Sequence, residues 1–160
     1  VARRAHGFGM RVIGWSRSGD SVPGVENVGF SELLAESDVV SINVALAQET
    51  LGLFDAEAIK SMKPGAVLVN TARGGIVDDL ALAEALVEKR LSAAGLDVFD
   101  GEPIGSDHPL AQLKNVVMTP HIGSASTRTR LRMAQLSVQN CLAGLEGRPL
   151  IHTANAEGLR

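Results

Sequence analysis

The sequence has very little cysteine and no excess of positive charge. The single cysteine, Cys141, cannot form an internal disulfide and offers no metal-ligand spacing, so no metal site is expected. A net charge of -3 argues against nucleic-acid or anionic-membrane surfaces, which bind through clustered Lys and Arg. No apolar run approaches the roughly 18 residues of a membrane span, and no signal-peptide apolar segment follows the basic start. These absences predict a cytoplasmic protein without nucleic-acid or membrane partners.

The remaining composition is that of an ordinary globular domain. The 160 residues are 45% hydrophobic and 21% charged, which excludes the disordered, collagen-like and coiled-coil classes. The chain opens with Val1 rather than Met, and the residues up to His6 resemble the body of a helix that ends at Gly7. We therefore expect further sequence to precede Val1.

Five apolar runs indicate the fold class. Each is almost continuously apolar, as is typical of strands covered on both faces, and helix patterns fill the intervals. Their starts lie about 23 to 28 residues apart, the spacing of βαβ units. The runs are Met10 to Trp15, Asp38 to Val44, Ala66 to Asn70, Ser92 to Val98 and Asn115 to Thr119. This alternation predicts an α/β fold with a doubly wound, Rossmann-like parallel sheet.

Short polar residues mark the expected helix starts. Ser31, Asp55, and Asp78 or Asp79 stand immediately before helix patterns, where their side chains can cap free backbone N–H groups. Ser124 and Ser126 precede the last helix. The helix after Asp78 or Asp79 is expected to close on Lys89 and Arg90. The helix after Ser126 is the longest, carries an apolar stripe and is expected to end at Gly147.

The predicted strand ends carry residues with useful chemistry. Ligands bind outside the carboxyl ends of parallel strands, where Arg73, Glu102 and His121 follow the third, fourth and fifth runs. Arginine binds carboxylates, histidine transfers protons near neutral pH, and a glutamate beside it favours its charged form. Taken together, these groups suit a 2-oxo acid. The other histidines lack this setting and are interpreted as structural: His6, His108 and His152.

Three segments carry a resemblance to a known family. They are Val69 to Asp78, Gly95 to Pro103 and Thr119 to Ala125. They resemble the D-isomer-specific 2-hydroxyacid dehydrogenases, and the likeness extends over essentially the whole chain. The most specific part is the ordered Arg, Glu, His triplet at separations of 29 and 19 residues (102 − 73 and 121 − 102). Residues 108–110, 114–116 and 123–130 look most like the glyoxylate and hydroxypyruvate reductases.

The resemblance implies roles for individual residues. Arg73 would bind the substrate carboxylate and carbonyl, His121 would be the acid/base catalyst, and Glu102 would pair with the histidine. The nicotinamide cofactor would supply hydride. Other positions that match the cofactor site are Val44, Thr50, Thr71, Ala72, Asp97, Gly123 and Ser124. The family also implies a homodimer.

The segment after the first run bears on the choice of cofactor. Dinucleotide folds that prefer NAD commonly place an acid at the corresponding strand end, whereas arginine accommodates the 2′-phosphate of NADP. The sequence there is Ser16-Arg17-Ser18, which predicts NADP, with NAD possible if Arg17 is solvated and Asp20 repels phosphate.

The resemblance also implies parts that this sequence does not contain. The family's first strand and glycine-rich loop would precede Val1, which makes residues 1–147 a partial dinucleotide-binding domain. Residues 148–160 would lead back to a substrate domain that is absent. The missing strand would be central in the sheet, so we expect the chain alone to be weakly stable or inactive.

Two other functions remain open at this stage. The C-terminal-binding corepressors resemble the same family, so a dinucleotide-sensing binding protein is one alternative. A reductase of a bulkier acid, such as 2-oxogluconate, is another. A phosphorylatable receiver domain is excluded because Arg73, Glu102 and His121 would have no role in it.

Overall fold

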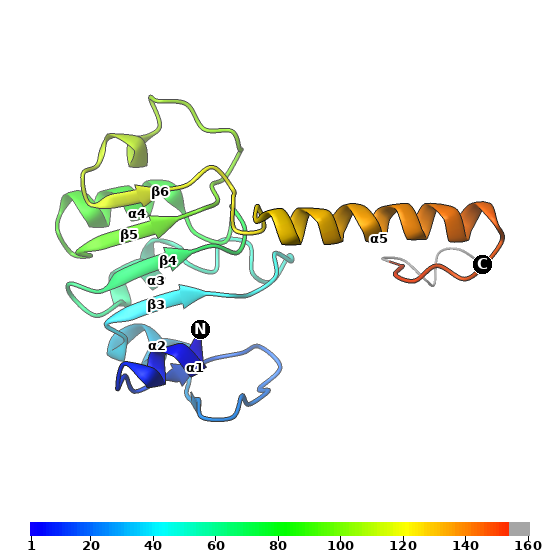
Figure 1. The fold of residues 1–160 in the computed structure, drawn as a ribbon. Coiled ribbons are helices and arrows are strands. Elements are labelled where there is room, and N and C mark those ends of the chain that lie inside the picture. The colour runs from blue at the N-terminus through cyan, green and yellow to red at the C-terminus, as the bar shows by residue number, and fades with distance from the viewer. Residues whose placement is uncertain (154–160) are drawn as a thin grey trace. The chain divides into compact units, whose positions relative to one another are not determined.

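The computed structural model describes residues 1–153 (Figure 1). It divides the chain into two compact units, Val1–His121 and Ile122–Arg160. Most of the predicted C-terminal segment, residues 154–160, lies outside the described residues. The first unit contains every strand and all but one of the described helices.

Helices and strands alternate along the first unit, as the sequence predicts, except that β2 follows β1 directly. Their bounds are α1 (Ala2–Gly7), β1 (Ile13–Gly14), β2 (Glu26–Asn27), α2 (Phe30–Glu36), β3 (Val39–Ile42), α3 (Ala56–Ser61), β4 (Val67–Asn70), α4 (Asp79–Val87), β5 (Ala93–Leu96), the 3₁₀ helix η1 (Pro109–Gln112) and β6 (Val116–Met118). The second unit contains α5 (Thr127–Leu145). All five predicted strands are present within their expected ranges, although each is shorter than its apolar run.

Four strands form the main sheet in the order β3-β4-β5-β6, and every neighbouring pair is parallel. This confirms the predicted α/β class. Strands β1 and β2 form a separate parallel pair, in which Ile13 lies opposite Glu26. The division between the two sheets falls between the first and second predicted strands, where the family resemblance places a central strand. The sequence did not predict β2, because Glu26 and Asn27 carry no apolar pattern.

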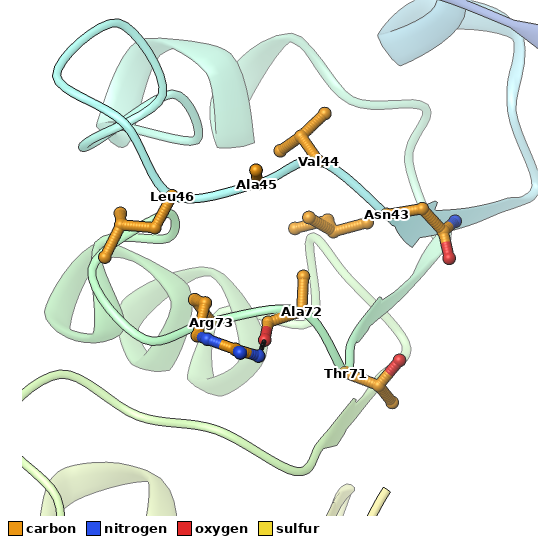
Figure 2. A pocket seen from close by; sticks show the side chains of 8 residues that line it. Asn43, Val44, Ala45, Leu46, Thr71, Ala72 and Arg73 are labelled. Carbon is orange, nitrogen blue, oxygen red and sulfur yellow. Dashed lines mark hydrogen bonds between the residues drawn. The ribbon is translucent and has the colours of Figure 1, made fainter. Parts of the chain in front are cut away.

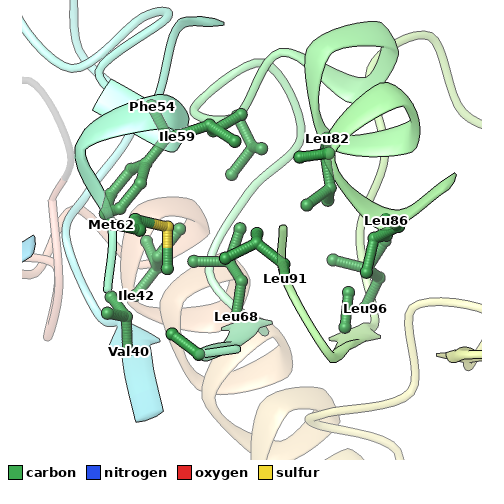
Figure 3. Close-up of a cluster of buried hydrophobic side chains, with 14 of the residues drawn as sticks. Val40, Ile42, Phe54, Ile59, Met62, Leu68, Leu82, Leu86, Leu91 and Leu96 are labelled. Atoms are coloured by element: carbon green, nitrogen blue, oxygen red, sulfur yellow. The ribbon is translucent and has the colours of Figure 1, made fainter. Parts of the chain in front are cut away.

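The core of the first unit lies between one face of the main sheet and helices α3 and α4 (Figure 3). Alternate strand residues point to this face, since successive side chains of a strand point to opposite sides. The buried side chains include Val40, Ile42, Leu68 and Leu96 from strands and Ile59, Leu82 and Leu86 from helices. Burying each such side chain contributes about 1.5–3 kcal/mol to the stability of the fold. The buried strands in turn hold the loops that follow them in place.

The helix starts agree with the sequence except in one case. The N–H of Ala58 donates to Asp55 at 2.8 Å, and Asp78 accepts from two N–H groups at the start of α4. Ser126 accepts from the Thr129 N–H at 3.2 Å and caps α5. The prediction for Ser31 is wrong: α2 begins at Phe30 after Gly29, and no side chain caps it.

The helix ends agree with the sequence less closely. Helix α4 stops at Val87, before the predicted Lys89 and Arg90, and Lys89 adopts a left-handed conformation with φ 58°. Helix α5 ends at Leu145, and Gly147 follows in a left-handed conformation as expected for a glycine after a helix. Among the described residues, no helix is both long and apolar enough to span a membrane.

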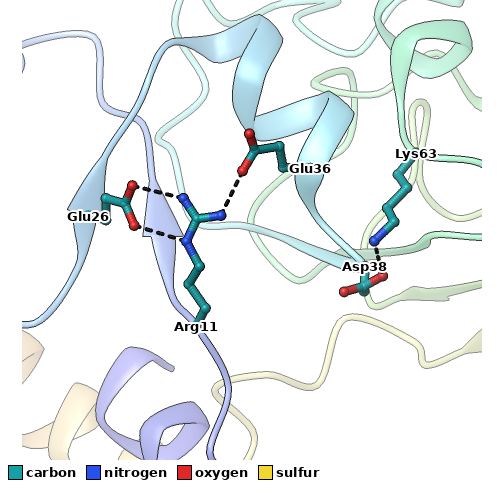
Figure 4. A network of polar contacts seen from close by, with 5 residues as sticks. All are labelled: Arg11, Glu26, Glu36, Asp38 and Lys63. Carbon is teal, nitrogen blue, oxygen red and sulfur yellow. Dashed lines mark hydrogen bonds and ion pairs between the residues drawn. The ribbon is translucent and has the colours of Figure 1, made fainter.

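Exposed ion pairs connect the first elements of the chain (Figure 4). Arg11 donates to Glu26 of β2 and to Glu36 of α2, at 2.8 and 2.7 Å between the charged atoms. Lys63 contacts Asp38 at 2.6 Å in the same way. Such exposed pairs are individually weak, so the core has the larger part in holding the sheet.

Gly74 fills a position where no side chain fits. A Cβ added there would lie 1.8 Å from the carbonyl oxygen of Phe99, because the backbones after β4 and β5 touch at this point. We therefore predict that Gly74→Ala destabilises the chain by about 1–3 kcal/mol or more, the cost of overpacking. Gly7→Ala is the control, since a Cβ at Gly7 meets nothing within 4 Å. Equal denaturation midpoints for the two variants would contradict this packing.

Candidate active site

Three loops at the carboxyl edge of the sheet carry the residues that the sequence singled out. Strands β4, β5 and β6 are parallel neighbours, so the loops after them leave the sheet on the same side. Arg73 lies in the first loop, Glu102 in the second and His121 in the third. The close approach of Gly74 to Phe99 brings the first two loops into backbone contact.

Glu102 and His121 form a direct pair. The carboxylate Oε2 of Glu102 lies 2.7 Å from Nδ1 of His121, and its Oε1 accepts the N–H of Phe99 at 2.8 Å. The hydrogen bond with His121, followed by that of the Phe99 N–H, holds the pKa of Glu102 below its ordinary value of 4.5. Both oxygens are thus occupied, and the carboxylate has a fixed orientation toward the ring.

The backbone of His121 has an unusual conformation. Its φ is 51°, in the left-handed region that few residues other than glycine adopt. Its N–H donates to the carbonyl of Thr119 at 3.0 Å, and the Thr119 hydroxyl donates to the carboxylate of Asp97. Asp97 is buried at the end of β5. The turn that presents the ring is therefore anchored to the neighbouring strand, which offsets its backbone strain.

A buried asparagine shapes the turn that carries Arg73. Asn70, the last residue of β4, accepts the N–H of Ala72 at 3.0 Å and donates to the carbonyl of Arg73 at 2.9 Å. Arg73 itself donates from Nη1 to the carbonyl of Ala72 at 2.6 Å (Figure 2). No role for Asn70 was predicted from the sequence, although an asparagine at a strand end is a common signal of such a turn.

A cavity of about 720 Å³ lies beside this turn (Figure 2). Its lining residues come from the ends of β3 and β4 and the loops after them: Ile42, Asn43, Val44, Ala45, Leu46, Thr71, Ala72 and Arg73. The volume lies within the usual range for cofactor sites, and small apolar side chains with a few polar groups are a typical lining. The cavity therefore has the size and the kind of lining that suit part of a bound cofactor.

The predicted cofactor residues are in different settings. Val44, Thr71 and Ala72 line the cavity, whereas Thr50 is buried and braces the loop beside it. The Thr50 hydroxyl donates to the carbonyl of Ala45 at 2.7 Å and accepts the N–H of Ala47 at 2.8 Å. Thr50 thus supports the cavity wall from behind.

The predicted phosphate-binding segment contacts two acids. Arg17 lies 3.0 Å from Glu49, with both side chains more than half exposed at 64% and 60%. Ser16 donates to the backbone carbonyl of Asp20 at 3.2 Å, and Ser18 donates to the Asp20 carboxylate. A bound 2′-phosphate would therefore compete with Glu49 for Arg17. Two further residues predicted to contact the cofactor, Gly123 and Ser124, belong to the second unit, Ile122–Arg160.

The fold and this site are those of an α/β domain of the dinucleotide-binding class with a hydrogen-bonded Glu–His pair at its sheet edge. The sequence profile described as "D-isomer specific 2-hydroxyacid dehydrogenase, NAD binding domain" matches residues 1–123. The chain belongs to the D-isomer-specific 2-hydroxyacid dehydrogenases.

Named relatives agree with this assignment. The chain is 47% identical over 151 residues to a glyoxylate reductase of Korarchaeum cryptofilum, covering 92% of this chain and 46% of that protein. It is 43% identical over 165 residues to a glyoxylate/hydroxypyruvate reductase B of Pectobacterium atrosepticum, covering 100% and 52%. The chain spans about half the length of the curated relatives it matches.

Solved structures share the fold. A Thermus thermophilus protein superposes with a TM-score of 0.91 at 49% identity, covering 96% of this chain and 49% of that one. A D-isomer-specific 2-hydroxyacid dehydrogenase of Xanthobacter autotrophicus, in complex with NADPH and MES, gives a TM-score of 0.78 at 35% identity. The alignment covers 94% of this chain and 63% of that one.

The Glu102–His121 pair makes the stability of the fold depend on pH. The pKa of Glu102 is lowered in the folded chain, so the pair stabilises the fold above pH 4.5 and loses this effect as the pH falls through the lowered value. We predict that His121→Asn raises the pKa of Glu102 toward 4.5, as followed by the ¹³C resonance of its carboxyl group. An unchanged titration would show that the pair does not form in solution.

Proposed function

We propose that the protein carrying this chain reduces a small 2-oxo acid, such as glyoxylate or hydroxypyruvate, to the 2-hydroxy acid. The observation that carries this proposal is the 2.7 Å contact between Glu102 and His121 on the sheet edge that also carries Arg73. The names of the relatives, glyoxylate reductase and glyoxylate/hydroxypyruvate reductase B, support the choice of substrate.

Each residue of the site has a task suited to its chemistry. The guanidinium of Arg73 binds the substrate carboxylate and carbonyl oxygen through paired N–H donors. The charged ring of His121 donates the proton on Nε2 to the carbonyl oxygen, while Glu102 accepts a hydrogen bond from Nδ1–H and stabilises the positive charge of the ring. In the reverse direction the neutral ring accepts the hydroxyl proton at Nε2.

The cofactor would lie in the cavity along the ends of β3 and β4. A nicotinamide dinucleotide supplies the hydride that reaches the carbonyl carbon. Val44, Thr71 and Ala72 would hold its nicotinamide end. Asp97, Gly123 and Ser124 are proposed to contribute on the strength of the family resemblance.

The histidine provides the most direct test of activity. We predict that His121→Asn in the whole protein lowers kcat for glyoxylate reduction by roughly 10²- to 10⁴-fold, the usual contribution of a general acid. His6→Asn, in the exposed helix α1, should leave kcat unchanged. Turnover is followed by the loss of nicotinamide absorbance.

Two results would contradict the proposal. One is tight dinucleotide binding by the whole protein without turnover of any small 2-oxo acid, which is the behaviour of a sensing protein. The other is turnover confined to a bulkier acid such as 2-oxogluconate.

We further propose NADPH as the preferred reductant, with Arg17 as the group that binds its 2′-phosphate. Arg17→Ala should lower kcat/KM for NADPH about tenfold or more and leave that for NADH nearly unchanged, since charged hydrogen bonds contribute about 1.5–3 kcal/mol. Glu49→Gln should raise kcat/KM for NADPH, because Glu49 competes for the same guanidinium. A preference of the unmutated protein for NADH would contradict this choice.

A further inference from the structure

Asp79 has a carboxylate that helix capping does not explain. It is the first residue of α4, but Asp78 already caps this helix by accepting the N–H groups of Leu80 and Ala81 at 3.0 Å. The Asp79 side chain is only 12% exposed. Burying a carboxylate is unfavourable unless hydrogen-bond or charged partners replace the lost water. The Asp79 carboxylate therefore requires partners outside the helix cap.

The partners of Asp79 lie on the loop that carries Glu102 and at the residue that precedes η1. Its Oδ2 accepts the N–H of Asp100 at 3.2 Å, and the same oxygen lies 3.6 Å from Nε2 of His108. The Nδ1 of His108 accepts the N–H of Leu110, which leaves Nε2 as the protonated nitrogen facing Asp79. Burial raises the pKa of Asp79, while the Asp100 N–H acts in the opposite direction.

Two consecutive N–H groups of this loop donate to carboxylates, and that of Asp100 is the second. One residue before it, the N–H of Phe99 donates to Glu102 at 2.8 Å. On the other side of the loop, the backbone of Gly74 touches Phe99 and Asp100. The loop is thus clamped between the Arg73 turn and the start of α4, and Glu102 leaves it toward His121 at 2.7 Å.

From this arrangement we propose that Asp79 is a positioning residue for the acid-base pair. By accepting the Asp100 N–H, it holds the Phe99–Glu102 loop in the conformation in which the Glu102 carboxylate meets the His121 ring. His108 lies against the same oxygen and favours the charged, accepting form of Asp79. The contribution to catalysis rests on the proposed reductase function, whereas the positioning itself concerns only contacts within this chain.

Nuclear magnetic resonance of the whole protein that carries this chain tests the positioning directly. We expect Asp79→Ala to speed the hydrogen exchange of the Asp100 amide about tenfold or more, because it removes a hydrogen bond to a charged group. The pKa of Glu102 should rise toward its ordinary value as its contact with His121 loosens. Asp79→Asn retains an acceptor oxygen and should show smaller changes of both kinds.

Asp78→Ala is the matched control, since it removes the cap of the same helix without touching the loop. It should lower the stability of the chain by about 1 kcal/mol and leave the pKa of Glu102 unchanged. A Glu102 pKa that stays constant in Asp79→Ala, or that moves equally in both variants, would overturn the proposal.

A measurement on the unmutated chain covers the case in which Asp79→Ala does not fold. Slow exchange of the Asp100 amide, which lies in an exposed loop, would support the proposal. Exchange as fast as that of a free loop amide would overturn it. Because no readout involves turnover, failure of the positioning role and failure of the reductase function are separate results.

Discussion

The hydrogen bond between Glu102 and His121 is the interaction on which the site depends. It joins the loops after β5 and β6 at 2.7 Å and selects one orientation of the imidazole. Since the carboxylate accepts from Nδ1, Nε2 is the ring nitrogen that we propose acts on the substrate carbonyl. The left-handed backbone of His121 and the buried Asp97 behind Thr119 serve the same orientation.

The parallel sheet provides the frame for this contact. Its buried face fixes the ends of β4, β5 and β6, and short loops then carry one functional side chain each. The absence of a side chain at Gly74 allows two of these loops to touch. Asn70, Thr119 and, as proposed, Asp79 supply the polar contacts that hold the loops in place.

The sequence predicted the strands from local signals, and the topology of the sheet predicted that Glu102 and His121 share one edge. The pairing of the two side chains was implied by the family resemblance. Apolar runs define buried strands, and parallel strands place their loops on one side. The prediction failed at Ser31, since α2 begins one residue earlier, at Phe30 after Gly29. It also failed at the polar strand β2, which forms by pairing with β1. The contact of Asp79 with Asp100 was not predicted either, since the two residues are 21 positions apart in the sequence. The assigned roles of Arg73 and the cofactor residues stay predictions.

The tautomer of His121 tests the central claim most directly. In long-range ¹H–¹⁵N spectra recorded where the ring is neutral, the account predicts a proton on Nδ1 and a lone pair on Nε2, with Glu102→Gln shifting this balance. A ring that carries its proton on Nε2, and that does not respond to Glu102→Gln, would contradict the account.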